Sequence, residues 1–261
     1  MTEPFDSAQH CIPPELPDEK RTPIRGLQRR MATAMVASAF GVPHVTEFLA
    51  IDVSATMAAR DRLATQPQFL NVKVSPLLFI ACALIRAIAR TPTVNGYWDQ
   101  AAGETVAKRH VNLGIAAATP RGLIVPNIKN AEQLSGRELA SALAQLASTA
   151  RAGKTTREEM TGGTITISNI GIFGVDSATP ILNPGESTIL AVGSIRRAPW
   201  VVTNNGAERI EARWITELSL SFDHRLIDGQ TGSRLLADVG AALHDPSLLA
   251  TLVPAVDGSV D

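Results

Sequence analysis

Residues 217–232 read ELSLSFDHRLIDGQTG, an alternating apolar run that leads directly into a cluster of ionisable side chains. The alternation predicts a β-strand over ELSLSF, and the Asp-Gly pair that follows predicts a turn and a helix from about residue 229 to 243. A buried strand that ends in several charged groups is unfavourable unless those groups are paired or used. This strand, turn and helix therefore indicate both the fold class and a first candidate site.

The residues alone leave three interpretations of the cluster Asp223, His224, Arg225 and Asp228 open. His224 could be catalytic, the charges could form a structural salt-bridge corner, or His224 and Asp228 could bind a metal ion, although a third ligand with suitable spacing is missing. Asp228 could orient a neighbouring cation or cap the following helix. The remaining histidines have contexts that favour structural or solvated roles: His10, His44, His110 and His244.

A second candidate segment lies upstream, where residues 162–171 read GGTITISNIG. The pattern predicts a strand that reaches a glycine-rich turn at Ser168 and Asn169. Their hydroxyl and amide groups could donate to an oxyanion or make turn hydrogen bonds, and without other information the turn is favoured. The segment has no G-x-S-x-G pattern, so nothing argues that Ser168 is a nucleophile.

Helices and further strands surround these two segments in a mixed order along the chain. Residues 77–85, LLFIACALI, predict a buried helix that starts at Ser75-Pro76, and residues 135–152 predict an amphipathic helix with a Ser135–Glu138 capping box. Helices are also expected over 24–41 and 56–64, a strand over 44–54, a hairpin over 95–111, two strands around a turn at 120–122, and a strand over 187–195. The chain has no nucleotide-binding glycine loop and no βαβαβ rhythm, so we expect one α/β domain of the α+β type with a mixed sheet.

The composition and the net charge exclude some classes of function and partner. Hydrophobic residues make up 45% and charged residues 19% of 261 residues, and the net charge is −1, so neither nucleic acid nor an anionic membrane is an expected partner. The two cysteines, Cys11 and Cys82, stand in unlike contexts and do not suggest a disulfide framework. No signal peptide is visible, and we expect a cytoplasmic protein. Residues 1–22 are expected to be a flexible leader, and residues 23–261 the folded domain.

Four motifs in order resemble the catalytic domain of dihydrolipoamide acyltransferases, the E2 components of 2-oxo acid dehydrogenase complexes. They are IRGLQRRMATAM followed by PHVTEF (24–35 and 43–48), RGLIVP (121–126), GGTITISNIG (162–171) and DHRLIDG (223–229). The resemblance runs from about residue 22 to the end of the chain. It implies a two-layer fold like that of chloramphenicol acetyltransferase, with a mixed sheet packed against helices, which forms trimers.

The resemblance also implies roles for particular residues. His224 is the general base that removes the proton of a thiol, whose ordinary pKa is about 8.5. Ser168 donates a hydrogen bond to the oxyanion of the tetrahedral intermediate, and Asp228 holds the site through an ion pair. The resemblance further implies that active sites lie between subunits, where His224 of one subunit meets Ser168 of its neighbour. No metal is implied. The positions that match coenzyme A contacts in the family are Arg60, Ser75, Ser168, Asn169, Gly193 and Ser194.

By the same resemblance, the chain transfers an acyl group between dihydrolipoamide and coenzyme A. The lipoyl group would come from a lipoyl domain absent from this chain. The partners would be two further copies in a homotrimer, a 24-subunit core, the decarboxylase (E1) and the dihydrolipoamide dehydrogenase (E3). The opening motif favours the branched-chain type, with isobutyryl or isovaleryl groups, over acetyl or succinyl. Two rival interpretations are a stand-alone O- or N-acyltransferase like the chloramphenicol enzymes, and a non-catalytic core scaffold.

Overall fold

A seven-stranded mixed sheet forms the centre of the computed structural model, which describes residues 19, 21–119, 122–245 and 247–248. The strands follow the order β1-β11-β9-β8-β4-β7, and β10 pairs with the first half of β11. Only the pairs β4–β8 and β8–β9 are parallel, and the other pairs are antiparallel. The expectation of a mixed sheet in an α/β fold is therefore confirmed.

The helices and strands have the following bounds. The helices are α1 (Gly26–Gly41), α2 (Ser54–Ala64), α3 (Pro76–Arg90), α4 (Gly136–Arg151) and α5 (Gly229–His244). The sheet strands are β1 (His44–Asp52), β4 (Leu113–Ile115), β7 (Asn127–Ile128), β8 (Ile165–Asn169), β9 (Thr188–Val192), β10 (Arg196–Asn204) and β11 (Ala207–Asp223). Two small hairpins are formed by β2 (Gly96–Asp99) with β3 (Glu104–Ala107) and by β5 (Ala117–Thr119) with β6 (Gly122–Ile124). Short 3₁₀ turns cover Pro67–Phe69, Pro92–Val94, Ala131–Gln133 and Gly171–Phe173.

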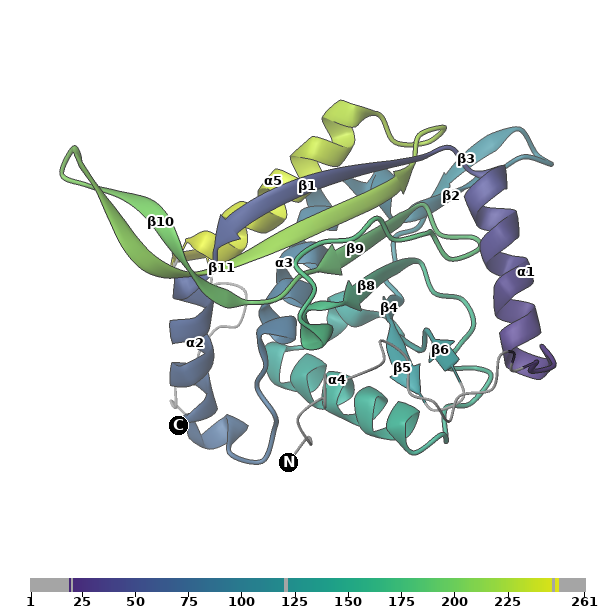
Figure 1. Ribbon diagram of the computed structural model, residues 1–261, viewed down its shortest axis with the longest axis horizontal. Coiled ribbons are helices and arrows are strands. Elements are labelled where there is room, and N and C mark those ends of the chain that lie inside the picture. The colour runs from purple at the N-terminus through teal and green to yellow at the C-terminus, as the bar shows by residue number, and fades with distance from the viewer. Residues whose placement is uncertain (1–18, 20, 120–121, 246, 249–261) are drawn as a thin grey trace.

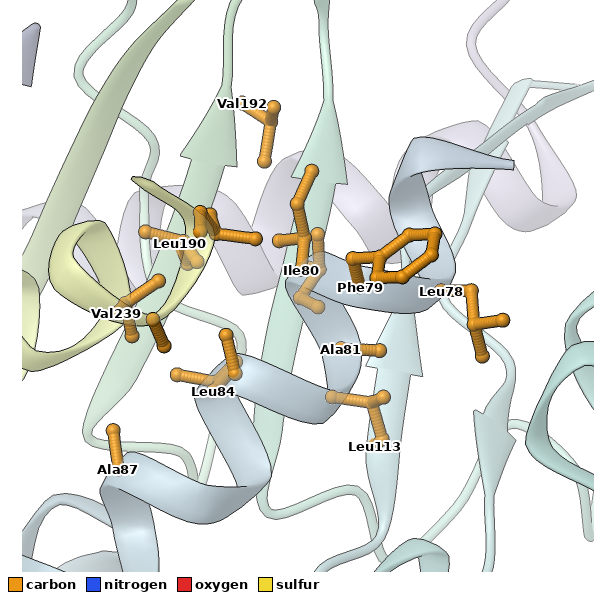
Figure 2. Packing of buried hydrophobic residues seen from close by; sticks show 14 of the residues in the cluster. Leu78, Phe79, Ile80, Ala81, Leu84, Ala87, Leu113, Leu190, Val192 and Val239 are labelled. Carbon is orange, nitrogen blue, oxygen red and sulfur yellow. The ribbon is translucent and has the colours of Figure 1, made fainter. Parts of the chain in front are cut away.

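One face of the sheet carries the hydrophobic core. Helices α3 and α5 lie behind the strands in Figure 1, and Figure 2 shows α3 side chains such as Phe79 and Leu84 among Leu190 of β9, Leu113 of β4 and Val239 of α5. Because side chains alternate along a strand, the neighbours of these core residues point to the opposite face. That face is polar and carries Thr166, Ser168, Ser219 and Ser221.

A long connection between β8 and β9 crosses the polar face, and residues 174–187 of it are called the strap below. The Ala178 N–H of the strap donates to the Ser219 hydroxyl, and the Asn183 amide donates to the Thr166 hydroxyl. The backbone of the strap also closes on the end of β9, since a Cβ at Gly193 would lie 1.7 Å from the Asp176 carbonyl oxygen. Glycine is therefore required at position 193 by the strap.

Several sequence expectations are confirmed and some are wrong in extent. The Ser135–Glu138 capping box, the buried helix after Ser75 and both small hairpins are present. The strand expected over residues 217–222 is much longer, because β11 begins at Ala207 and pairs with β10, a strand that the sequence did not predict. Figure 1 shows that this β10–β11 hairpin projects from the body of the molecule.

The predicted leader, residues 1–22, lies almost wholly outside the described residues, so its boundary stays a prediction. None of the helices in the described part of the chain has the length and apolar character needed to cross a membrane.

Candidate active site

His224 is the first residue after β11, and the strand fixes its backbone while leaving its ring accessible. Its N–H donates to the Pro43 carbonyl at 3.0 Å, directly ahead of the neighbouring strand β1. The ring packs against Phe222 with 5.9 Å between the ring centroids and an angle of 54° between the planes. Among the described residues, no side chain or backbone group forms a hydrogen bond with the ring nitrogens of this exposed histidine. The imidazole is thus available for a substrate.

Asp223 and Arg225, on either side of His224, form the salt-bridge corner that was one of the three interpretations. The Asp223 carboxylate is buried and accepts hydrogen bonds from Nε and Nη2 of Arg225 at 3.0 and 2.7 Å. The guanidinium lies over the Trp98 ring, 5.5 Å from its centroid. Sequence reasoning missed Trp98, since nothing in the chain order indicates that the β2–β3 hairpin reaches this corner. This salt bridge therefore holds the residues on either side of His224 in place.

Asp228 caps α5, as one of the sequence alternatives proposed. Its Oδ1 accepts the Thr231 N–H at 2.8 Å. Hydrogen bonds from Thr231, first that of its side chain and then that of its N–H, lower the pKa of Asp228 below its ordinary value, with smaller contributions from the charges of His224 and Arg234. In the described part of the chain Asp228 forms no ion pair within 4.0 Å, so the ion pair that the resemblance implied stays a prediction. The same residues contain no group of three His, Cys, Asp or Glu side chains that could hold a metal ion.

Ser168 and Asn169 end β8, and both side chains are half-buried. Because side chains alternate along the strand, Ser168 lies on the polar face and Asn169 on the face that packs against α3. The sequence favoured turn hydrogen bonds for them. Within the described residues, however, neither the Ser168 hydroxyl nor the Asn169 amide forms a hydrogen bond. Both groups are therefore free to bind a ligand at the end of the strand.

One chain does not bring Ser168 and His224 together. Ser168 pairs with Ala191, which pairs with Ser219 on its other side, so these three residues form one row across the sheet. His224 follows Asp223, which is four residues further along β11 than Ser219, or about 13 Å at the usual rise of a strand. The two intervening strand spacings add about 10 Å in the perpendicular direction. The two side chains are too far apart to act on one carbonyl group.

A cleft of about 190 Å³ lies at the Ser168 end of the strands. It is lined by Asn169 and Gly193, two of the predicted coenzyme A contacts, together with Pro76, Leu77, Ile80, Gly171, Ile172, Val192 and Ile195. Two further predicted contacts adjoin it in sequence: Ser75 is the residue directly before α3, and Ser194 follows Gly193. Most of the predicted coenzyme A contacts therefore lie in or next to one cleft.

Two of the predicted contacts, Ser194 and Arg60, already have partners within the chain. The Ser194 hydroxyl donates to the Asp176 carboxylate, which also accepts two hydrogen bonds from Arg196 at 3.0 and 2.9 Å. These bonds lower the pKa of Asp176, with Arg196 as the main cause. Arg60, on α2, donates its Nε–H to Asp61 at 2.9 Å and is absent from the lining of the cleft. Its role as a phosphate contact stays a prediction.

Sequence reasoning also missed Glu186, a half-buried residue near the end of the strap. It lines a second cleft of about 400 Å³, between the strap, residues 123–125 and the glycines at 162–163. Oε2 accepts hydrogen bonds from the Thr166 hydroxyl at 2.7 Å and the Asn183 amide at 3.3 Å. Burial raises the pKa of Glu186 to about 7 in spite of these bonds. Only the position of Glu186 in the fold shows this, because in sequence it is one acid among many.

Comparison with known proteins agrees with this geometry. Residues 16–251 match the family described as 2-oxoacid dehydrogenases acyltransferase (catalytic domain). The dihydrolipoyllysine-residue acetyltransferase component of the pyruvate dehydrogenase complex of Staphylococcus aureus is 39% identical over 226 residues. That alignment covers 87% of this chain and 52% of the relative, so the chain spans about half the length of the curated protein that it matches.

Two solved structures are similar over nearly their whole length. The dihydrolipoamide acetyltransferase of Azotobacter vinelandii has a TM-score of 0.82 and 31% identity, and the match covers 91% of this chain and 99% of that one. The cubic core of a pyruvate dehydrogenase multienzyme complex has the same TM-score, identity and coverage. The Azotobacter structure comes from an investigation of a serine, a histidine and an asparagine in the catalytic mechanism, and the asparagine follows the histidine by four positions.

Proposed function

Because this chain belongs to the catalytic-domain family of the 2-oxoacid dehydrogenase acyltransferases, we propose that it transfers an acyl group between a dihydrolipoyl thiol and coenzyme A. The observation that carries the proposal is the imidazole of His224 at the end of β11, whose ring nitrogens form no hydrogen bond within the described residues and whose charge acts on the Asp228 carboxylate. The histidine and the residue four positions later match the spacing of the catalytic histidine and asparagine named for the Azotobacter enzyme.

The proposed mechanism uses His224 as general base. At neutral pH only a few per cent of an ordinary thiol is ionised, so a neutral imidazole that removes the thiol proton accelerates the reaction by about 10²–10⁴-fold. The thiolate attacks the thioester carbonyl carbon and forms a tetrahedral oxyanion. When that intermediate collapses, the C–S bond to the first carrier breaks, and the departing sulfur takes the proton back from His224.

Ser168 is proposed as the donor to the oxyanion, where a single hydrogen bond is typically worth about 10²–10³ in rate. The separation of Ser168 from His224 along the sheet supports a donor from another copy of the chain. Each site would then combine His224 of one subunit with Ser168 of its neighbour in a homotrimer. Coenzyme A would enter by the cleft lined by Asn169 and Gly193.

Larger assembly is proposed from the cubic core among the similar structures. A 24-subunit core of trimers fits that likeness. Its partners would be the decarboxylase (E1), the dihydrolipoamide dehydrogenase (E3) and a lipoyl domain that delivers the acyl group. The catalytic domain would act in the cytoplasm.

The acyl group is proposed to be acetyl. The Staphylococcus and Azotobacter relatives are both named as acetyltransferases, and they do not support the branched-chain preference that the opening motif suggested. A pocket that distinguishes substrates by one methylene group usually achieves only about 10–200-fold discrimination. Isobutyryl and succinyl groups are therefore expected as slower substrates.

One assay tests reaction class and acyl group together. Dihydrolipoamide is offered with acetyl-, succinyl- or isobutyryl-coenzyme A, beside a small hydroxyl and a small amine acceptor, and free coenzyme A is measured. The proposal predicts transfer to dihydrolipoamide, fastest with acetyl. Transfer to the hydroxyl or amine alone would favour a stand-alone acyltransferase, and no transfer in the assembled protein would favour a scaffold. His224→Ala, the matched control, should reduce the rate to background with the assembly intact.

A further inference from the structure

The His44 imidazole forms a hydrogen bond with each of its two nitrogens. Nε2 lies 3.0 Å from the Leu182 N–H, and Nδ1 lies 2.8 Å from the Val42 carbonyl oxygen. A backbone N–H can only donate and a carbonyl can only accept, so Nε2 must carry the lone pair and Nδ1 the proton. The neutral ring in one tautomer is the only form of His44 that makes both bonds.

The peptide group at Leu182 is held from both of its sides. His44 accepts its N–H, and the Ser38 hydroxyl of α1 donates to its carbonyl at 2.7 Å. The Leu182 side chain is completely buried and Ser38 nearly so. The middle of the strap is thus fixed to the corner where α1 passes into β1, at the side of the molecule on which α1 stands in Figure 1.

The same corner and the same strap hold the backbone at His224. The Pro43 carbonyl, next to His44, accepts the His224 N–H at 3.0 Å. At the end of the strap, the Ser187 carbonyl accepts the Asp223 N–H at 2.9 Å. His44 is also the register partner of Asp223 between β1 and β11. His44 therefore joins the two segments that together set the position of His224.

We propose that His44 is a positioning residue for His224, which it serves by accepting the Leu182 N–H. The inference rests on the proposed function of His224 as general base. Without that acceptor, the strap and the α1–β1 corner separate, and the two carbonyl groups that fix residues 223 and 224 shift. A misplacement of about 1 Å at a reacting group can cost about 10²-fold in rate.

The expected signature is a loss in turnover without a loss in coenzyme A binding. The cleft lined by Asn169 and Gly193 lies at the opposite end of the strands from His224. In His44→Leu we therefore expect kcat to fall by about 10–100-fold, while KM for coenzyme A stays within about twofold. A general loss of structure would raise KM as well.

Two substitutions separate the hydrogen bond from the volume of the ring. His44→Leu removes the acceptor, whereas the terminal carbonyl of His44→Gln can reach the Leu182 N–H, so the glutamine variant should recover most of kcat. His244→Gln is the matched control, because His244 also bonds a backbone carbonyl, that of Asp52, far from the site. It should leave kcat unchanged. Equal kcat in the leucine and glutamine variants, or a parallel change of kcat and KM, would overturn the proposal.

Amide hydrogen exchange gives a readout that does not depend on activity. Exchange at the Leu182 and His224 amides should accelerate in His44→Leu but not in His44→Gln, and unchanged exchange in the leucine variant would overturn the positioning role. If His44→Leu does not fold, Ser38→Ala is the alternative test, because it removes the other side-chain hydrogen bond to the Leu182 peptide group. This variant should lower kcat by several-fold and accelerate hydrogen exchange at the Leu182 and His224 amides. If the wild-type protein transferred no acyl group, the proposed function would be refuted. The exchange experiment would still test whether the His44 hydrogen bond holds the backbone at residues 182 and 224.

Discussion

Replacing Glu186 with glutamine should stabilise the protein at alkaline pH and have little effect in acid. Burial raises the pKa of this carboxyl group to about 7 from an ordinary value of 4.5. A group whose pKa is higher in the folded state holds its proton more tightly there. Its contribution to stability is therefore fully present below pH 4.5 and is lost as the pH rises through 7.

The size of the effect follows from the difference between the two pKa values. Each pKa unit corresponds to about 1.4 kcal/mol, so the rise from 4.5 to about 7 lowers the free energy of unfolding by at most about 3.5 kcal/mol once the pH exceeds 7. Glutamine does not titrate, and its carbonyl oxygen can accept the same bonds from Thr166 and Asn183. The variant should thus exceed the wild type by less than about 1 kcal/mol at pH 5 and by about 1–3 kcal/mol at pH 8.

Urea unfolding of both proteins between pH 5 and 8 measures this difference directly, because all other groups titrate alike in the pair. Glu104→Gln, at an exposed position of β3, serves as the control and should leave the pH profile unchanged. If Glu186→Gln follows the wild-type profile in parallel, the carboxyl group does not titrate in this range and the argument from its burial is wrong.

Substitutions at four further positions test the cap of α5, the start of α4, the packing of α5 and the oxyanion donor. Asp228→Ala should cost about 1 kcal/mol of unfolding free energy, whereas Asp228→Asn keeps the cap on α5 and should be nearly neutral in urea unfolding. Ser135→Ala removes one half of the capping box of α4 and should also cost about 1 kcal/mol, with no change in acyl transfer. Gly232→Ala places a Cβ 2.4 Å from a ring carbon of Phe222, so thermal unfolding should show a loss of about 1–3 kcal/mol. Ser168→Ala should lower kcat by about 10²–10³ and leave KM nearly unchanged, and an effect confined to KM would contradict its oxyanion role.

The sequence predicts those helices and strands whose pattern of buried and capping residues can be recognised within one short segment. Residues 77–85 are apolar on nearly every side, and they form the buried centre of α3. The Ser135–Glu138 pair predicts the start of α4 because both partners of the capping box lie within one turn. The alternation in residues 217–222 likewise predicts the buried half of β11.

The projecting β10–β11 hairpin is missed for the opposite reason. Residues 207–216 are mostly exposed or half-buried, so no face of this ribbon needs a continuous apolar pattern. Helix α1 shows a related limit: the apolar positions Met31 and Met35 are only half-buried in the chain, and Ile24 precedes the helix and is exposed. An apolar stripe predicts that a face will be covered, but not by which segment.

The residues alone do not predict the long-range relations in the candidate site. Motifs identify Ser168 and His224, and the family resemblance implies that they meet between subunits, but their separation within one chain is visible only in the strand register. The two bonds of His44 join it to Val42 and to Leu182, which is 138 residues away. A histidine after a proline has no local feature that reveals such a partner, and the sequence accordingly favoured a plain structural role.

The proposed mechanism depends most on an active site shared between two chains, and subunit mixing tests that sharing most directly. His224→Ala and Ser168→Ala chains are each expected to be nearly inactive alone. When the two are coexpressed in equal amounts, a site with both groups intact arises wherever the histidine and serine come from different, complementary chains. Acyl transfer should then return to about one quarter of the wild-type rate per site. Assembled mixtures that remain as inactive as either variant alone would contradict a site that joins His224 of one chain with Ser168 of another.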